Sequence, residues 1–201
     1  MRPAGAAFLA TLVSASPAFA HDLAENRYAL GLFIDGFGLP LERPELVLAM
    51  VAPAILGALW SSDAPARLAL PFAIAATIAI PAARLFTFAP SSPLLVAALL
   101  TALPVVADRS SRVMATFAAA ACGALTGYGA IALLGHDAAA PPPMLALGAA
   151  CGATFFFAAF AAAATLPGLF LPAAATRIGL CIAASWTGAI ALMMLAFNFS
   201  R

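Results

Sequence analysis

Long apolar stretches separated by short polar segments dominate this chain. The stretches cover residues 45–60, 68–88, 93–107, 113–135, 144–171 and 178–199. A helix needs about 20 apolar residues to cross the hydrocarbon layer of a membrane. Four of the stretches reach this length, whereas the first and the third are shorter. We therefore predict an all-α, polytopic membrane helix bundle with about six transmembrane helices, which form a single domain over residues 21–201.

The composition supports a membrane class. The chain has 201 residues, of which 65% are hydrophobic and 8% are charged, and its mean hydropathy is +1.06. A soluble domain carries roughly 25% charged residues, so this chain has too few charged side chains to cover a surface that faces water. We therefore expect the lipid bilayer to surround the protein. A net charge of +1 provides no basic surface for nucleic acid, which is excluded as a partner.

The N-terminus has the pattern of a secretory signal peptide over residues 1–20. Arg2 supplies the positive charge, residues 6–13 are apolar, and residues 18–20 read Ala-Phe-Ala, an A-x-A cleavage site. Cleavage there would make His21 the first residue of the mature chain. The alternative is an uncleaved first helix, but the apolar run is too short to cross a bilayer.

The arginines predict the orientation, because cytoplasmic loops of membrane proteins carry an excess of Lys and Arg. With the mature N-terminus outside, the cytoplasmic loops contain Arg67, Arg109, Arg112 and Arg177. The outer loops at 89–92 and 136–143 contain no arginine. We therefore expect a multi-pass protein of the bacterial inner membrane with a periplasmic N-terminus.

Glycines and prolines predict how the helices pack. Gly123 and Gly127 form one GxxxG pattern, and Gly148 and Gly152 form another. Such small faces allow the close backbone approach on which helix packing in lipid depends. The second and third stretches contain four prolines, which predict kinks or interruptions: Pro71, Pro81, Pro93 and Pro104.

The segment before the first stretch has the strongest indication of function. Asp35, Glu42 and Glu45 are three of the eight acidic residues of the chain. Carboxylates at membrane depth are costly and are candidates for cation binding. On a continuous helix, Glu42 and Glu45 would share a face. This segment, residues 36–44, could also extend the first stretch backwards as a broken or re-entrant helix.

A structural interpretation of the same residues is also open. Pro44 and Glu45 suit the first turn of a helix, where proline is tolerated and an acidic group complements the helix dipole. Asp35, which precedes Gly36-Phe37-Gly38, suits an Asx-type turn. Arg43 would neutralise either neighbouring glutamate, which counts against cation binding.

Other candidate metal ligands are few. His21, with a free amino group and Asp22, could bind a divalent ion weakly, and the alternative is a mobile terminus that binds none. Cys122, Cys151 and Cys181 lie one each in the last three stretches, where they could converge as soft ligands or act as small packing residues. No catalytic grouping of side chains occurs, so we expect neither an enzyme nor a bound cofactor.

Residues 36–50 resemble the GFxHPxxGxDHLLAM motif of the HupE/UreJ family, membrane proteins associated with nickel or cobalt uptake. The matching residues are Gly36, Phe37, Pro40, Leu48, Ala49 and Met50. At the motif's two histidine positions this chain has Leu39 and Leu46, and Glu45 replaces the aspartate. The motif has a glycine three positions after its proline, and this chain has Arg43 there.

The resemblance continues beyond this motif, again without the histidines. The family's HGxxHG stretch reads CGALTG here, with Cys122 and Thr126 at the histidine positions, and Gly129 replaces an acidic residue. The family's AT…LH segment is matched by Ala153-Thr154, but Phe157-Ala158 offer no histidine. The resemblance implies the family's fold and the transport of a divalent transition-metal ion.

Three functional hypotheses follow. In the first, nickel or cobalt meets Asp35, Glu42 and Glu45 at the outer face and passes between the first, fourth and fifth stretches, with Cys122 as a further ligand. In the second, the protein is a non-transporting accessory subunit that packs beside another membrane protein or a second copy. A transporter of an uncharged or organic substrate is a third alternative.

Overall fold

The computed structural model describes residues 29–83, 92–106, 111–132 and 142–199. Over these residues the fold is all-helical, which confirms the predicted class. The α-helices are α2 (Ala29–Glu42), α3 (Pro44–Trp60), α4 (Ala64–Ala82), α5 (Ser92–Val106), α6 (Arg112–Ala132), α7 (Pro143–Thr165) and α8 (Ala173–Phe199), and a 3-10 turn, η1 (Leu166–Leu169), follows α7. The predicted signal peptide, His21 and Arg109 lie outside the described residues.

The helices are those of a membrane protein. Arg112–Ala132, Pro143–Leu169 and Ala173–Asn198 are each long and apolar enough to cross a bilayer. The pair Ala29–Glu42 and Pro44–Trp60 passes the same test jointly, with a bend of 76° between its two helices. Ala66–Ala82 and Ser92–Pro104 are shorter apolar helices. A helix therefore lies in each of the six predicted stretches, and α2 is an additional helix that precedes them.

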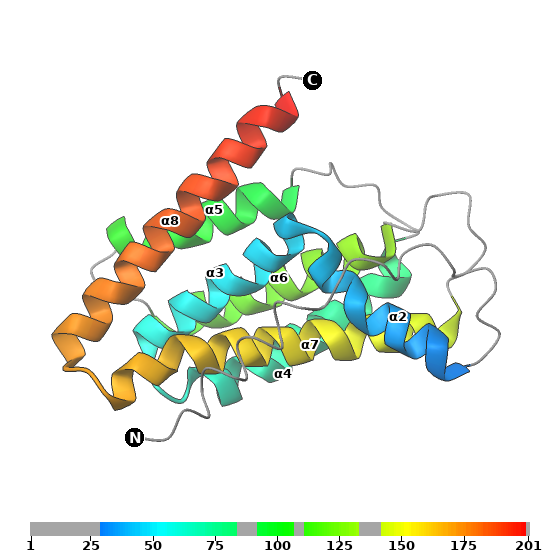
Figure 1. The fold of residues 1–201 in the computed structure, drawn as a ribbon, viewed down its shortest axis with the longest axis horizontal. Coiled ribbons are helices and arrows are strands. Elements are labelled where there is room, and N and C mark those ends of the chain that lie inside the picture. The colour runs from blue at the N-terminus through cyan, green and yellow to red at the C-terminus, as the bar shows by residue number, and fades with distance from the viewer. Residues whose placement is uncertain (1–28, 84–91, 107–110, 133–141, 200–201) are drawn as a thin grey trace.

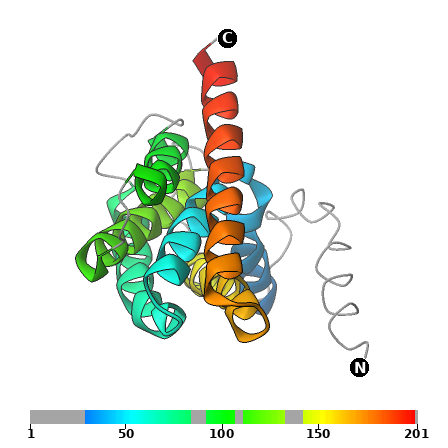
Figure 2. The same cartoon turned by 90° about the vertical axis from the view of Figure 1, so that its left-hand side faces the viewer.

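Helix α3 lies at the centre of the bundle. It contacts every other described α-helix, and its neighbours pair around it as α4 with α6, α2 with α7 and α5 with α8 (Figure 1). Nine residues of α3 are buried. Helix α8 crosses the bundle obliquely and packs against α5 as far as Gly188 and Ala191, and only its C-terminal end projects beyond the other helices (Figure 2).

The helices alternate in direction. Helices α3 and α7 finish at the same end of the bundle at which α4, α6 and α8 begin, on the left in Figure 1. The first two turns of these last three helices contain Arg67, Arg112 and Arg177, respectively. The described arginines of the predicted cytoplasmic loops thus share one end of the bundle.

The predicted GxxxG pattern of α6 packs against α4. A Cβ atom added at Gly123 would collide with the carbonyl oxygen of Phe72, and one added at Gly127 would collide with that of Ala76. Both glycines are buried. The absence of a side chain therefore lets the two backbones approach more closely than any larger residue would allow.

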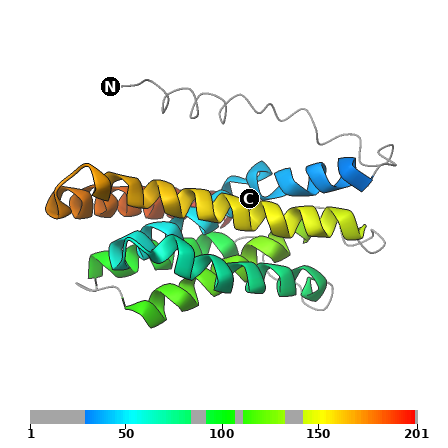
Figure 3. The same ribbon diagram turned by 90° about the horizontal axis from the view of Figure 1, so that it is seen from below.

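Helices α2 and α7 are joined by the same kind of contact, with glycines contributed by both helices. Gly148 and Gly152 of α7 face the carbonyl groups of Phe33 and Phe37 in α2, and Gly36 of α2 faces the carbonyl group of Leu145. Helix α2 consequently lies along the N-terminal half of α7 (Figure 3).

The four prolines of the second and third stretches do not interrupt the described helices, whereas the alternative, a kink, stays a prediction. Helix α4 continues through Pro71 and Pro81, and α5 continues through Pro104, whereas Pro93 lies in the first turn of α5. A proline removes one backbone hydrogen bond, but neighbouring helices and side chains can satisfy the group that it leaves. Packing within the bundle therefore keeps these helices continuous.

We expect Gly127→Ala to destabilise the protein by about 1–3 kcal/mol, because the new methyl group overpacks the contact with α4. Gly179→Ala is the matched control, since a Cβ atom there meets nothing within 4 Å. Unfolding of the purified protein in mixed micelles with increasing denaturing detergent measures both. Equal stability of the two variants would contradict the close α4–α6 contact.

Candidate functional site: a bent segment above an apolar interior

The bent segment, residues 35–50, consists of the C-terminal half of α2 and the first two turns of α3. Helix α2 ends at Glu42, and Arg43 adopts an extended conformation with φ −116° and ψ 123° before α3 begins at Pro44. Proline disfavours a helical conformation in the residue before it, and it has no N–H to continue the hydrogen bonds of α2. The sequence Arg43-Pro44 therefore explains the break, and the predicted broken extension of the first stretch is confirmed.

The carboxylates of the bent segment are arranged around this break. Glu42 is exposed at the end of α2, and Glu45 lies in the first turn of α3. Arg43 and Glu45, on either side of Pro44, form an ion pair in which Nη1 lies 3.5 Å from Oε1. Pro44 and Glu45 thus occupy a helix start, as the structural interpretation predicted, and the helix dipole of α3 stabilises the charge of Glu45.

Two of the local predictions are wrong. Glu42 and Glu45 do not share the face of one continuous helix, because the 76° bend lies between them. Asp35 is not in a turn: it lies with Gly36-Phe37-Gly38 inside α2 and is half-buried. The physical reason is that Gly36 serves the close contact with α7 rather than chain reversal.

The remaining candidate ligands lie apart. Cys122 is buried in α6, Cys151 is exposed on α7, and Cys181 is half-buried in α8, all as free thiols. Within the described ranges, no three His, Cys, Asp or Glu side chains gather where they could hold a metal ion. Of the two alternatives for the cysteines, convergence as metal ligands is therefore not found in these ranges, and His21 lies outside them.

The positions at which the family resemblance expects ligands are nevertheless brought to the interior. Leu39, Leu46, Cys122 and Thr126 are at most 4% exposed. Leu46 of α3 reaches Gly129 of α6, where a Cβ atom would collide with its side chain. Leu39 belongs to a cluster with Ile131 and Leu145, whereas Cys122 belongs to the cluster of Met50 and Phe157, so the positions are buried in different parts of the interior.

Aromatic packing closes the interior on the side of α7. Phe157 is fully buried and stacks on Phe72 of α4 with a ring-centroid distance of 4.2 Å and an interplanar angle of 4°. Both rings belong to the cluster that contains Met50 and Cys122. The neighbouring Phe155 is 55% exposed, so the Phe155–Phe157 run has one ring in the interior and another on the surface of the bundle.

Three buried threonines in the described helices bond to their own helix, whereas the buried hydroxyl group of Ser92 has no hydrogen-bond partner among the described residues. Thr126 Oγ1 donates to the Cys122 carbonyl at 2.7 Å, and Thr187 Oγ1 donates to the Ala183 carbonyl at 2.8 Å. Thr101 Oγ1 lies 3.0 Å and 2.9 Å from the carbonyl oxygens of Ala97 and Ala98. Each of these threonine hydroxyl groups donates a hydrogen bond to a carbonyl group of its own helix, which offsets the free-energy cost of burying it.

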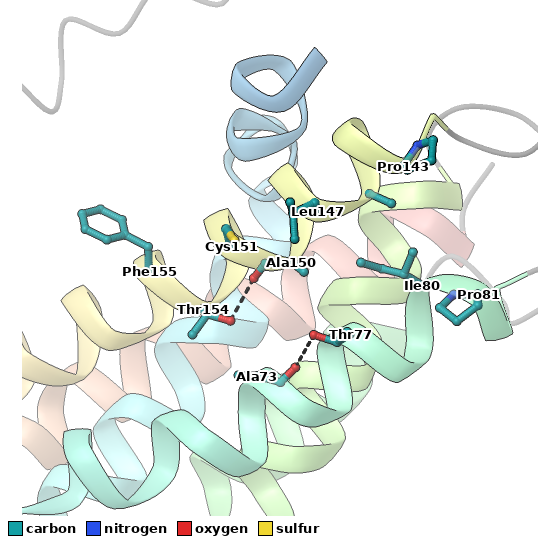
Figure 4. A pocket seen from close by; sticks show the side chains of 11 residues that line it. Ala73, Thr77, Ile80, Pro81, Pro143, Leu147, Ala150, Cys151, Thr154 and Phe155 are labelled. Atoms are coloured by element: carbon teal, nitrogen blue, oxygen red, sulfur yellow. Dashed lines mark hydrogen bonds between the residues drawn. The ribbon is translucent and has the colours of Figure 1, made fainter. Parts of the chain in front are cut away.

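A groove that the sequence did not reveal lies between α4 and α7 (Figure 4). It has a volume of about 890 Å³ and an almost entirely apolar lining. Its hydroxyl groups, on Thr77 and Thr154, donate to the carbonyl groups of Ala73 and Ala150 at 2.8 Å. No sequence pattern indicates the groove, because it arises where two helices distant in sequence diverge.

Comparison with known proteins identifies no relative. No protein-family description, curated protein or solved structure matches the chain.

The exposures of the cysteines predict their reactivity. In mild detergent, a small maleimide should label Cys151 faster than Cys122, because Cys122 is 0% exposed and Cys151 is on the surface of the bundle. Peptide mass spectrometry after brief labelling measures both sites, and denatured protein is the control that should label at both. Rapid labelling of Cys122 in the folded protein would contradict the closed interior.

Proposed function

We propose that this protein is a HupE/UreJ-like membrane protein that moves nickel or cobalt across the bacterial inner membrane. The observation that carries the proposal is the break in the first span, at the segment that resembles the family motif. Broken helices in transporters expose backbone dipoles and side chains to a substrate at membrane depth. Here the break lies between two glutamates.

The electrostatics of the break favour a cation at Glu42. The C-terminal end of a helix carries about half a negative charge, and Glu42 adds a full charge at the end of α2. Glu45 contributes a second carboxylate, although Arg43 competes for it. Oxygen ligands hold nickel and cobalt less tightly than imidazole does, and weak binding suits a site that must release its ion again.

The apolar interior below the break corresponds to a closed state. A cation moving between α3 and α6 would have to displace Leu46 from Gly129. It would then meet the cluster of Met50, Cys122 and Phe157. In the proposed cycle, a cation enters from the proposed periplasmic side, binds at the break, and α3 and α6 then separate.

Orientation is proposed from the arginines. Helices α4, α6 and α8 begin at the same end of the bundle (Figure 1). Their first two turns contain Arg67, Arg112 and Arg177, respectively. Trp60 lies at the same end, with the Arg67 guanidinium 5.8 Å from its ring centroid. Tryptophan and arginine are typical of a membrane interface, and arginine is typical of its cytoplasmic side.

Radiolabelled nickel and cobalt uptake by cells that lack their own permeases tests the proposal. We expect uptake that depends on this protein and falls at least severalfold in Glu45→Gln. Asp63→Asn is the matched control, because Asp63 is an exposed carboxylate paired with Arg67 at the other end of α3, about 25 Å away along that helix. No uptake by the inserted wild-type protein, or equal uptake by the two variants, would overturn the proposal.

A second variant, which removes a positive charge instead of a negative one, makes this experiment more specific. Arg43→Gln removes the competitor for the Glu45 carboxylate, whose ion pair is partly exposed. Breaking an exposed ion pair changes an equilibrium by roughly two- to fivefold, so uptake at low metal concentration should rise by about that factor. A fall in uptake would show that Arg43 supports the site rather than competing at it.

The second candidate function is a non-transporting accessory subunit, and the exposure of α8 favours it. Only 22% of the apolar part of α8 is buried in the bundle, compared with 56% for α6 and 50% for α7 with η1. Ile178, Ile182 and Trp186 are 62%, 55% and 68% exposed. A membrane-protein partner or a second copy could cover this face.

Purification in mild detergent tests this second candidate. An accessory subunit should retain a partner at fixed stoichiometry, identified by mass spectrometry, and Trp186→Ala should release it. Leu70→Ala on α4 is the control, because Leu70 is similarly exposed at 66%. A monomer that shows metal uptake would exclude the accessory function.

A further inference from the structure

No further inference is drawn: the strongest candidate, the apolar groove between α4 and α7 that Thr77, Cys151 and Thr154 border, carries none because nothing in the described part of the chain shows what covers it.

Discussion

Close backbone contact at glycine is the interaction on which this fold depends. Lipid is as apolar as leucine, so helices in a membrane gain little from burying apolar side chains and rely on close packing instead. Gly123 and Gly127 provide that packing between α4 and α6, and Gly36, Gly148 and Gly152 provide it between α2 and α7. The two helix pairs flank α3, whose apolar side chains fill the space between them.

The same contacts determine the shape of the candidate site. Because α2 is held along α7 while α3 occupies the centre, the chain has to change direction between the two helices. Arg43 and Pro44 permit the change, since a residue before proline favours an extended conformation. The bend then sets Glu42 at a helix end and Glu45 at a helix start, so the charges of the site follow from the packing of glycines elsewhere.

The sequence predicted the all-helical class, the helices in the six apolar stretches and the packing role of the two GxxxG patterns. It left two interpretations open for the segment that forms the second half of α2, a turn and a broken extension of the first stretch, because Asp35, Gly36 and Gly38 are typical of a turn when only neighbouring residues are considered. Gly36 is helical because α7 approaches it, and that contact joins residues more than 100 positions apart. The convergence of Leu46 with Gly129 and the groove beside Cys151 likewise depend on tertiary packing, which local patterns do not contain.

The packing of α3 against α6 places Leu46 against Gly129, two of the family-like positions, and cross-linking tests it most directly. In protein whose native cysteines are replaced by alanine, Leu46→Cys with Gly129→Cys should form a disulfide on mild oxidation, because a Cβ atom at Gly129 would touch the Leu46 side chain. Leu46→Cys with Gly179→Cys should not, since Gly179 faces open space. Cross-linking of the second pair without the first would contradict the central position of α3 and the site proposed around it.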